Sequence, residues 1–176
     1  MYICPDISEA EAHTIFMIKK RRNPISFFRR AKLKRVELFY VPLYLFEILI
    51  QSEKGVNCTV ICCDAILGET AIFKGQDHQH SEQALGKVFR PELDPEQVEE
   101  KVRKYGHDLI LDQTMGYGRK GSLQDVNFTE TVFYPFWVGY FEKRGCYDFR
   151  ITDGITGQLQ GPKMRLLFLQ FLRQLS

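Results

Sequence analysis

The sequence lacks the cysteine patterns and the long apolar runs typical of disulfide-rich, zinc-binding or membrane-spanning proteins. Its five cysteines are an odd number without a CxxC pair, which argues against a disulfide framework and a zinc ribbon. The longest apolar run, residues 36–50, is interrupted by Glu37, Pro42 and Glu47 and is shorter than the ~20 residues that span a bilayer. Glu9 and Glu11 fall where a signal peptide would be apolar. We therefore expect a reduced, cytoplasmic chain without a transmembrane helix.

The chain also lacks the composition of a disordered protein. It has 176 residues, of which 44% are hydrophobic, 13% aromatic and 26% charged. This length fits one ordinary domain or two small ones of about 88 residues.

Net charge is nearly absent overall but strongly segregated. The formal net charge is +2, yet residues 19–35 hold nine positive charges and no negative one, which leaves −7 for the remainder. This basic segment predicts a surface for polyanions, either nucleic acid or an anionic membrane. The alternative is a helix C-terminus followed by a solvated linker. The nine residues are Lys19, Lys20, Arg21, Arg22, Arg29, Arg30, Lys32, Lys34 and Arg35.

Two stretches 86 residues apart resemble each other and predict helix starts. In residues 5–12 and 91–98, a proline is followed by an N-cap residue, Ser8 or Asp94. Glu11 and Gln97 stand three residues after these caps, where each side chain can bond back to the N–H of the cap. An internal repeat is therefore expected.

Strand patterns recur in the same order. The aromatic–proline steps at Pro42 and Pro135 are offset by 93 residues, and the shifting offset places insertions in loops. Proline cannot donate to a sheet ladder, so both residues are expected at strand beginnings, bulges or edges. The predicted strands cover about 37–51, 56–64 and 70–74 in the first half, and 129–142, 146–153 and 158–160 in the second.

Two Asp-x-x-x-Gly segments favour tight turns over catalysis. Asp64 and Gly68, like Asp153 and Gly157, follow a predicted strand. An aspartate at a turn entry accepts hydrogen bonds from the backbone that follows, and the glycine supplies a positive φ. A catalytic role for the two carboxylates is the less favoured alternative.

On these motifs the chain resembles the duplicated region of primosomal protein N-prime-like zinc-ribbon proteins. The matching segments are residues 40–44, 134–137 and 147–162, and the turns are similar to PepSY and cystatin-like units. The resemblance implies an α+β fold and leaves the activity open. No zinc ribbon precedes the first repeat, and residues 164–176 are too short for the membrane helix that similar proteins can carry.

We therefore expect an α+β protein of two cystatin/PepSY-like repeats, residues 1–90 and 91–176. Each repeat is expected to pack a helix on a small antiparallel sheet, and a C-terminal helix follows. In that helix six apolar residues fill one arc of about 140°, which is wider than packing on a single sheet requires, whereas Leu166 and Leu169 fall among polar residues. The helix therefore indicates an interface with a like subunit, another protein or a membrane surface, unless it is buried on both sides. The arc comprises Met164, Leu167, Phe168, Phe171, Leu172 and Leu175.

No catalytic residue, metal or cofactor is predicted. Asp77, His78, His80 and Glu82 could ligate a metal, but a stretch between glycines is more typical of a solvated loop. The cysteines of the segment 58–63 are expected to be buried small side chains. The sequence thus favours a non-enzymatic protein-interaction or ligand-binding module, with polyanion binding as the alternative and an enzyme disfavoured.

Overall fold

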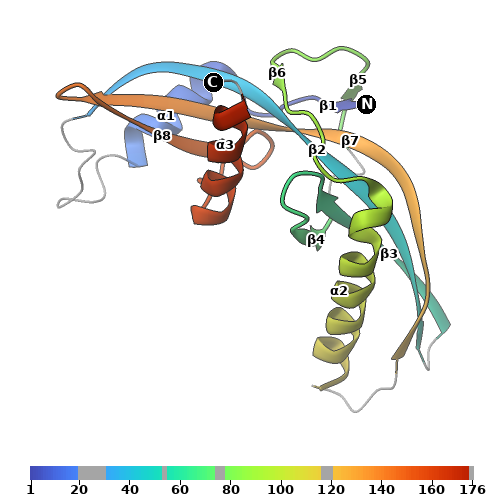
Figure 1. Cartoon of the computed structure of the whole chain (residues 1–176). Coiled ribbons are helices and arrows are strands. Elements are labelled where there is room, and N and C mark those ends of the chain that lie inside the picture. The colour runs from blue at the N-terminus through green and yellow to red at the C-terminus, as the bar shows by residue number, and fades with distance from the viewer. Residues whose placement is uncertain (20–30, 53–54, 74–77, 116–120, 175–176) are drawn as a thin grey trace. The chain divides into compact units, whose positions relative to one another are not determined.

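The computed structural model describes residues 1–19, 31–52, 55–73, 78–115 and 121–174. These contain three helices and one sheet of eight strands, most of whose pairs are antiparallel, so the α+β class is confirmed (Figure 1). The helices are α1 (Glu9–Lys19), α2 (Pro95–Met115) and α3 (Pro162–Gln174). The strands are β1 (Tyr2–Ile3), β2 (Lys32–Ser52), β3 (Gly55–Asp64), β4 (Thr70–Ile72), β5 (His80–Ser81), β6 (Lys87–Val88), β7 (Gly121–Lys143) and β8 (Cys146–Asp153).

The sheet has the order β4-β3-β2-β7-β1-β5, with β6 paired to β2 and β8 paired to β7. Its residues fall into two compact units that each draw on both halves of the chain. Unit 1 comprises Met1–Val41, His80–Phe89 and Phe133–Ser176, and unit 2 comprises Pro42–Gln79 and Arg90–Val132. The long strands β2 and β7 contribute to both units. The expected division into residues 1–90 and 91–176 follows the sequence repeat instead of these contacts and stays a prediction.

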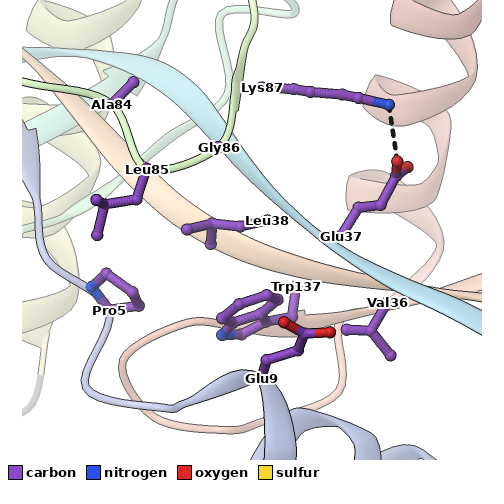
Figure 2. Close-up of a pocket in the computed structure, with 10 residues that line it drawn as sticks. All are labelled: Pro5, Glu9, Val36, Glu37, Leu38, Ala84, Leu85, Gly86, Lys87 and Trp137. Carbon is purple, nitrogen blue, oxygen red and sulfur yellow. Dashed lines mark hydrogen bonds and ion pairs between the residues drawn. The ribbon is translucent and has the colours of Figure 1, made fainter.

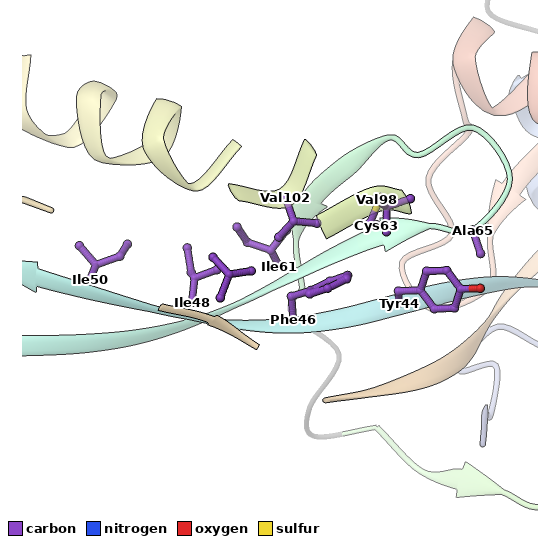
Figure 3. Close-up of a cluster of buried hydrophobic side chains, with 10 residues drawn as sticks. Tyr44, Phe46, Ile48, Ile50, Ile61, Cys63, Ala65, Val98 and Val102 are labelled. Carbon is purple, nitrogen blue, oxygen red and sulfur yellow. The ribbon is translucent and has the colours of Figure 1, made fainter. Parts of the chain in front are cut away.

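Unit 2 packs α2 onto the β2–β3 hairpin. The capping pattern at its start is confirmed, because the Asp94 N–H donates to Gln97 Oε1 at 2.8 Å. Alternate residues of β2 point to the helix, and Figure 3 shows these side chains meeting Val98 and Val102 of α2. The buried cluster consists of Tyr44, Phe46, Ile48, Ile50, Ile61, Cys63, Ala65, Val98, Val102 and Val126.

Unit 1 has a helix on each face of its strands. Its α1 begins with the predicted capping box, in which the Ser8 N–H donates to Glu11 Oε2 at 2.8 Å. This helix buries Phe16 in one cluster with Tyr40, whereas the neighbouring Phe39 stacks edge-on against Phe168 of α3 at 5.4 Å between ring centroids. Successive residues of a strand point to opposite faces, so α1 and α3 cover different sides.

The predicted starts of the two long strands are wrong. Strand β2 begins at Lys32 instead of 37, and β7 begins at Gly121 instead of 129. Both prolines lie inside these strands, at points where the neighbouring strand changes. On β2 the β6 pairing ends at Tyr40 and the β3 pairing starts at Leu43, so Pro42 falls between two ladders that need no N–H from it.

Candidate functional site

The first turn carboxylate, that of Asp64, is buried, and both of its oxygens accept hydrogen bonds from backbone N–H groups. Its Oδ1 accepts the N–H groups of Ile66 and Leu67 at 3.1 and 2.6 Å, and its Oδ2 accepts that of Glu69 at 2.8 Å. Gly68 has a φ of 72° and donates to the Asp64 carbonyl. This arrangement closes the turn after β3 and leaves the carboxylate little access to a substrate.

The second turn carboxylate, Asp153, has a similar set of bonds. Its Oδ1 accepts the N–H groups of Ile155 and Thr156 at 2.8 and 2.9 Å, and the Tyr134 hydroxyl lies 3.1 Å from both oxygens. Gly157 has a φ of 67°. Both aspartates thus accept hydrogen bonds from the backbone of the turns that they were predicted to form.

The cysteines of β3 differ in their surroundings. Cys63 is buried in the unit 2 cluster and Cys62 is half-buried, but Cys58 is exposed, so the expectation of burial is wrong for Cys58. Cys58 lies towards the hairpin end of β3, opposite Leu49, away from the covered part of the strand. Burial raises the pKa of Cys62 to about 11 and that of Cys63 to about 12, which makes both thiols poor nucleophiles at neutral pH.

The histidine-rich stretch is only partly visible. Asp77 lies outside the described residues, and His80 is exposed. Within the described ranges, no three His, Cys, Asp or Glu side chains come together as a metal-binding group.

The basic segment is also seen only in part. Lys32 is exposed, Lys34 pairs with Glu142, and the Arg35 guanidinium lies 3.6 Å from Glu37 and 4.4 Å from the centre of the Tyr140 ring. Two of the described cations therefore already have acidic partners within unit 1. Lys19 ends α1, and its side chain is not described; Lys20, Arg21, Arg22, Arg29 and Arg30 lie outside the described residues.

The C-terminal helix exposes three leucines on one side. Leu166, Leu169 and Leu172 are 54%, 39% and 37% exposed, while Phe168 and Phe171 are buried. These three residues, named the α3 stripe below, follow each other at helical spacing. Leu172 belongs to the apolar arc of the sequence and is nevertheless exposed, because the aromatic contacts with Phe39 and Phe89 turn Phe168 and Phe171 to the sheet. Leu175 lies outside the described residues.

A groove of about 530 Å³ in unit 1 was not anticipated from the sequence. Figure 2 shows Trp137, Leu38 and Val36 with Leu85 and Pro5 around this space, and the carboxylate of Glu9 beside them. We name it the Trp137 groove. Its lining residues are Pro5, Glu9, Val36, Glu37, Leu38, Ala84, Leu85, Gly86, Lys87 and Trp137.

A polar network lies beside the groove on β2. Lys87 Nζ is 2.9 Å from Glu37 Oε1. Burial raises the pKa of the Glu37 carboxyl, but hydrogen bonds from Lys87 and Tyr140, with the charge of Arg35, hold it below its ordinary value. Burial, together with the charge of Glu37, raises the pKa of Tyr140 to about 12. Glu37 is therefore ionised and Tyr140 neutral at physiological pH.

Sequence reasoning missed the groove because its residues come from four separate segments. One signal was present: Trp137 is the only tryptophan of the chain. Aromatic residues with a polar end are enriched at binding interfaces. The pattern on β7 alone, however, indicated only a core position.

No protein-family model matches the chain, and no curated protein or solved structure matches it either. The resemblance to the duplicated zinc-ribbon proteins thus stays a prediction. None of the described helices is long and apolar enough to cross a membrane.

Proposed function

We propose that this protein is a non-enzymatic protein-interaction module whose contact surface is the α3 stripe. The observation that carries the proposal is the exposure of Leu166, Leu169 and Leu172 on a helix whose opposite side is buried. Clustered exposed apolar side chains are costly in water and are typical of interaction sites. The engagement of Asp64 and Asp153 in backbone turns supports the non-enzymatic part of the proposal.

The simplest partner for this stripe is a second copy of the chain. Light scattering at rising concentration is expected to show a mass above the 20.6 kDa of one chain. The double variant L166E/L169E is expected to stay at the monomer mass, because burying two carboxylates in an apolar contact is unfavourable.

A matched control is Val56→Glu, which alters an exposed apolar residue of unit 2. It should associate like the unaltered protein. If the unaltered chain remains monomeric at every concentration, self-association through the α3 stripe is excluded.

We further propose that the chain is built from two similar α+β repeats of the PepSY or cystatin type. Support comes from equivalent pairings at the predicted offsets: Tyr2 pairs with Phe133 in the same parallel manner as Val88 pairs with Tyr40. Thr152 and Leu159 likewise form a bridge where Cys63 and Thr70 pair. These correspondences support the proposed repeat in addition to the sequence motifs.

Polyanion binding is a second candidate, supported by the nine positive charges of residues 19–35. Charge reversal at Arg29, Arg30, Lys32 and Lys34 should then lower the salt concentration that elutes the protein from heparin. Lys104→Glu, an exposed basic position on α2, serves as the control. Unchanged retention on heparin and DNA after the reversal would exclude this candidate.

A further inference from the structure

The Trp137 groove has an apolar floor. Val36 and Leu38 of β2 lie beside Trp137 there. Leu38 is buried with Trp137 in the unit 1 cluster, and Val36 packs against that cluster while staying partly exposed, so Val36 is the open part of this floor.

The rim of the groove is an anchored loop with an exposed leucine. The Tyr40 hydroxyl hydrogen-bonds to the backbone of Leu85, and Lys87 pairs with both Phe39 in the sheet and the Glu37 carboxylate. Gly86 lies so close to β2 that an added Cβ would be 2.4 Å from the Leu38 carbonyl oxygen. The backbone is thus fixed on both sides of Leu85, whose residue surface is nevertheless 69% exposed.

An anchored backbone that holds a leucine in water preorganises a binding contact. The backbone of the loop has already lost its freedom, so a ligand that covers the side chain gains hydrophobic energy at a reduced entropic cost. The volume of about 530 Å³ falls within the range of known ligand sites.

The edge of β2 offers backbone groups to an extended ligand. Strand β3 pairs with β2 from Leu43 onward and β6 pairs with Phe39 and Tyr40, so neither reaches Val36. The Leu38 carbonyl faces Gly86, and residues two apart in a strand direct their backbone groups to the same edge. The N–H and C=O of Val36 therefore point to that same edge of β2, which is the arrangement that lets a peptide add a strand.

The charge at the groove is negative on the α1 side. Glu9, in the first turn of α1, is exposed and lines the groove, whereas Lys87 is paired with Glu37. Among the residues that the structure describes, no cation pairs with Glu9, so its carboxylate favours a cationic group beside the apolar floor.

From these contacts we propose that the Trp137 groove binds an extended peptide with an apolar side chain and a lysine or arginine two residues apart. The apolar side chain packs on Val36 and under Leu85, beside Trp137, and the cation pairs with Glu9. Residues two apart in a strand face the same side, so both contacts are made at once. This site does not involve the α3 stripe.

The fluorescence of Trp137, the single tryptophan, provides a direct measurement. The probes are two blocked peptides without aromatic residues, acetyl-Ser-Leu-Ser-Lys-Ser-amide and its glutamine analogue acetyl-Ser-Leu-Ser-Gln-Ser-amide. The lysine peptide is expected to change the emission saturably and to bind roughly fivefold more tightly than the glutamine peptide, as one partly exposed ion pair allows.

Two variants test the two contacts. Glu9→Gln should weaken the lysine peptide about fivefold and leave the glutamine peptide unchanged. Leu85→Ser should weaken both peptides about tenfold, because it removes apolar contact. Their controls are Glu100→Gln and Val56→Ser, at exposed positions of unit 2. L166E/L169E should bind both peptides normally, which separates this site from the α3 stripe.

The proposal is overturned if neither peptide gives a saturable change up to about 1 mM, the weak end of specific affinity. It is equally overturned if Leu85→Ser binds as well as the unaltered protein. Equal binding of both peptides, unaffected by Glu9→Gln, would contradict the pairing of the cation.

Discussion

In both units an aromatic side chain on the long strand donates a hydrogen bond to the chain just before the helix. The bulky residue that packs between helix and strand, however, comes from the helix in unit 1 and from the strand in unit 2. In unit 1 the Trp137 indole N–H donates to the Ile7 carbonyl at 2.7 Å, and in unit 2 the Tyr44 hydroxyl donates to the Leu93 carbonyl at 2.5 Å. Each accepting residue stands just before the N-cap of its helix. An aromatic residue on the strand therefore fixes the start of the helix in both units.

The large side chain that fills the space between helix and strand lies on the helix in unit 1 and on the strand in unit 2. In unit 1 a large Phe16 on α1 lies over Gly139, where an added Cβ would be 2.7 Å from the Phe16 ring. In unit 2 the residues at the repeat offsets are Val102 on α2 and Phe46 on β2, and both are buried in one cluster. The space between helix and strand is thus filled by a pair of residues in each unit, although neither member of the pair is the same in the two units.

Truncating the helix residue should produce the largest difference between the units. Phe16→Ala is expected to lower the free energy of unfolding by about 3–5 kcal/mol, because Gly139 offers no side chain to fill the cavity. Val102→Ala should cost only about 2 kcal/mol, since it removes two methyl groups. Urea denaturation measures both values, and equal losses would contradict this difference between the units.

The second largest difference in stability is expected between the alanine variants of the two turn aspartates, Asp64 in unit 2 and Asp153 in unit 1. Asp64→Ala leaves the buried N–H groups of its turn without an acceptor and is expected to cost about 2–3 kcal/mol. Asp153→Ala removes the acceptor of two backbone N–H groups, so it should lower the free energy of unfolding by less, about 1–2 kcal/mol. Thermal unfolding of each variant gives the comparison. A larger loss for Asp153 would reverse the ranking.

A larger residue at Gly139 on the strand of unit 1 should disturb the packing against α1. A smaller residue at Phe16 on α1 should restore part of the lost stability. Gly139→Ala is expected to cost about 1–3 kcal/mol, because the new methyl group meets the buried Phe16 ring. Combined with Phe16→Leu, the loss should be smaller than the sum of the two single losses, by about 0.5–3 kcal/mol. A double-mutant cycle in urea measures this coupling, and strict additivity would refute it.

Glu37 should give the smallest effect, visible in the dependence of stability on pH. Its lowered pKa means that the ionised carboxylate stabilises the fold above its ordinary pKa of 4.5, and that this contribution is lost as pH falls below that value. Glu37→Gln should reduce this acid sensitivity by less than about 1 kcal/mol. Glu130→Gln, the exposed residue at the repeat offset in unit 2, should leave it unchanged. An equal effect of both variants would contradict the assignment.

Local signals along the chain were enough to locate several parts of this fold. The caps at Ser8 and Asp94 and the extent of β8 could be predicted, because a cap or a hairpin strand is specified by residues within a few positions of one another. The bonds at Asp64 and Asp153 also join residues within five positions. The helical periodicity of α3 similarly placed Leu166 and Leu169 away from its buried arc.

Contacts between distant segments decided the rest. The early starts of β2 and β7 depend on sheet pairing, and the outward turn of Leu172 depends on where Phe39 and Phe89 hold α3. The Trp137 groove exists only because the 84–87 loop is held against β2 beside α1. Short-range patterns specify backbone conformation, whereas a binding surface depends on which segments fold next to each other, and that is settled by packing across the whole sheet.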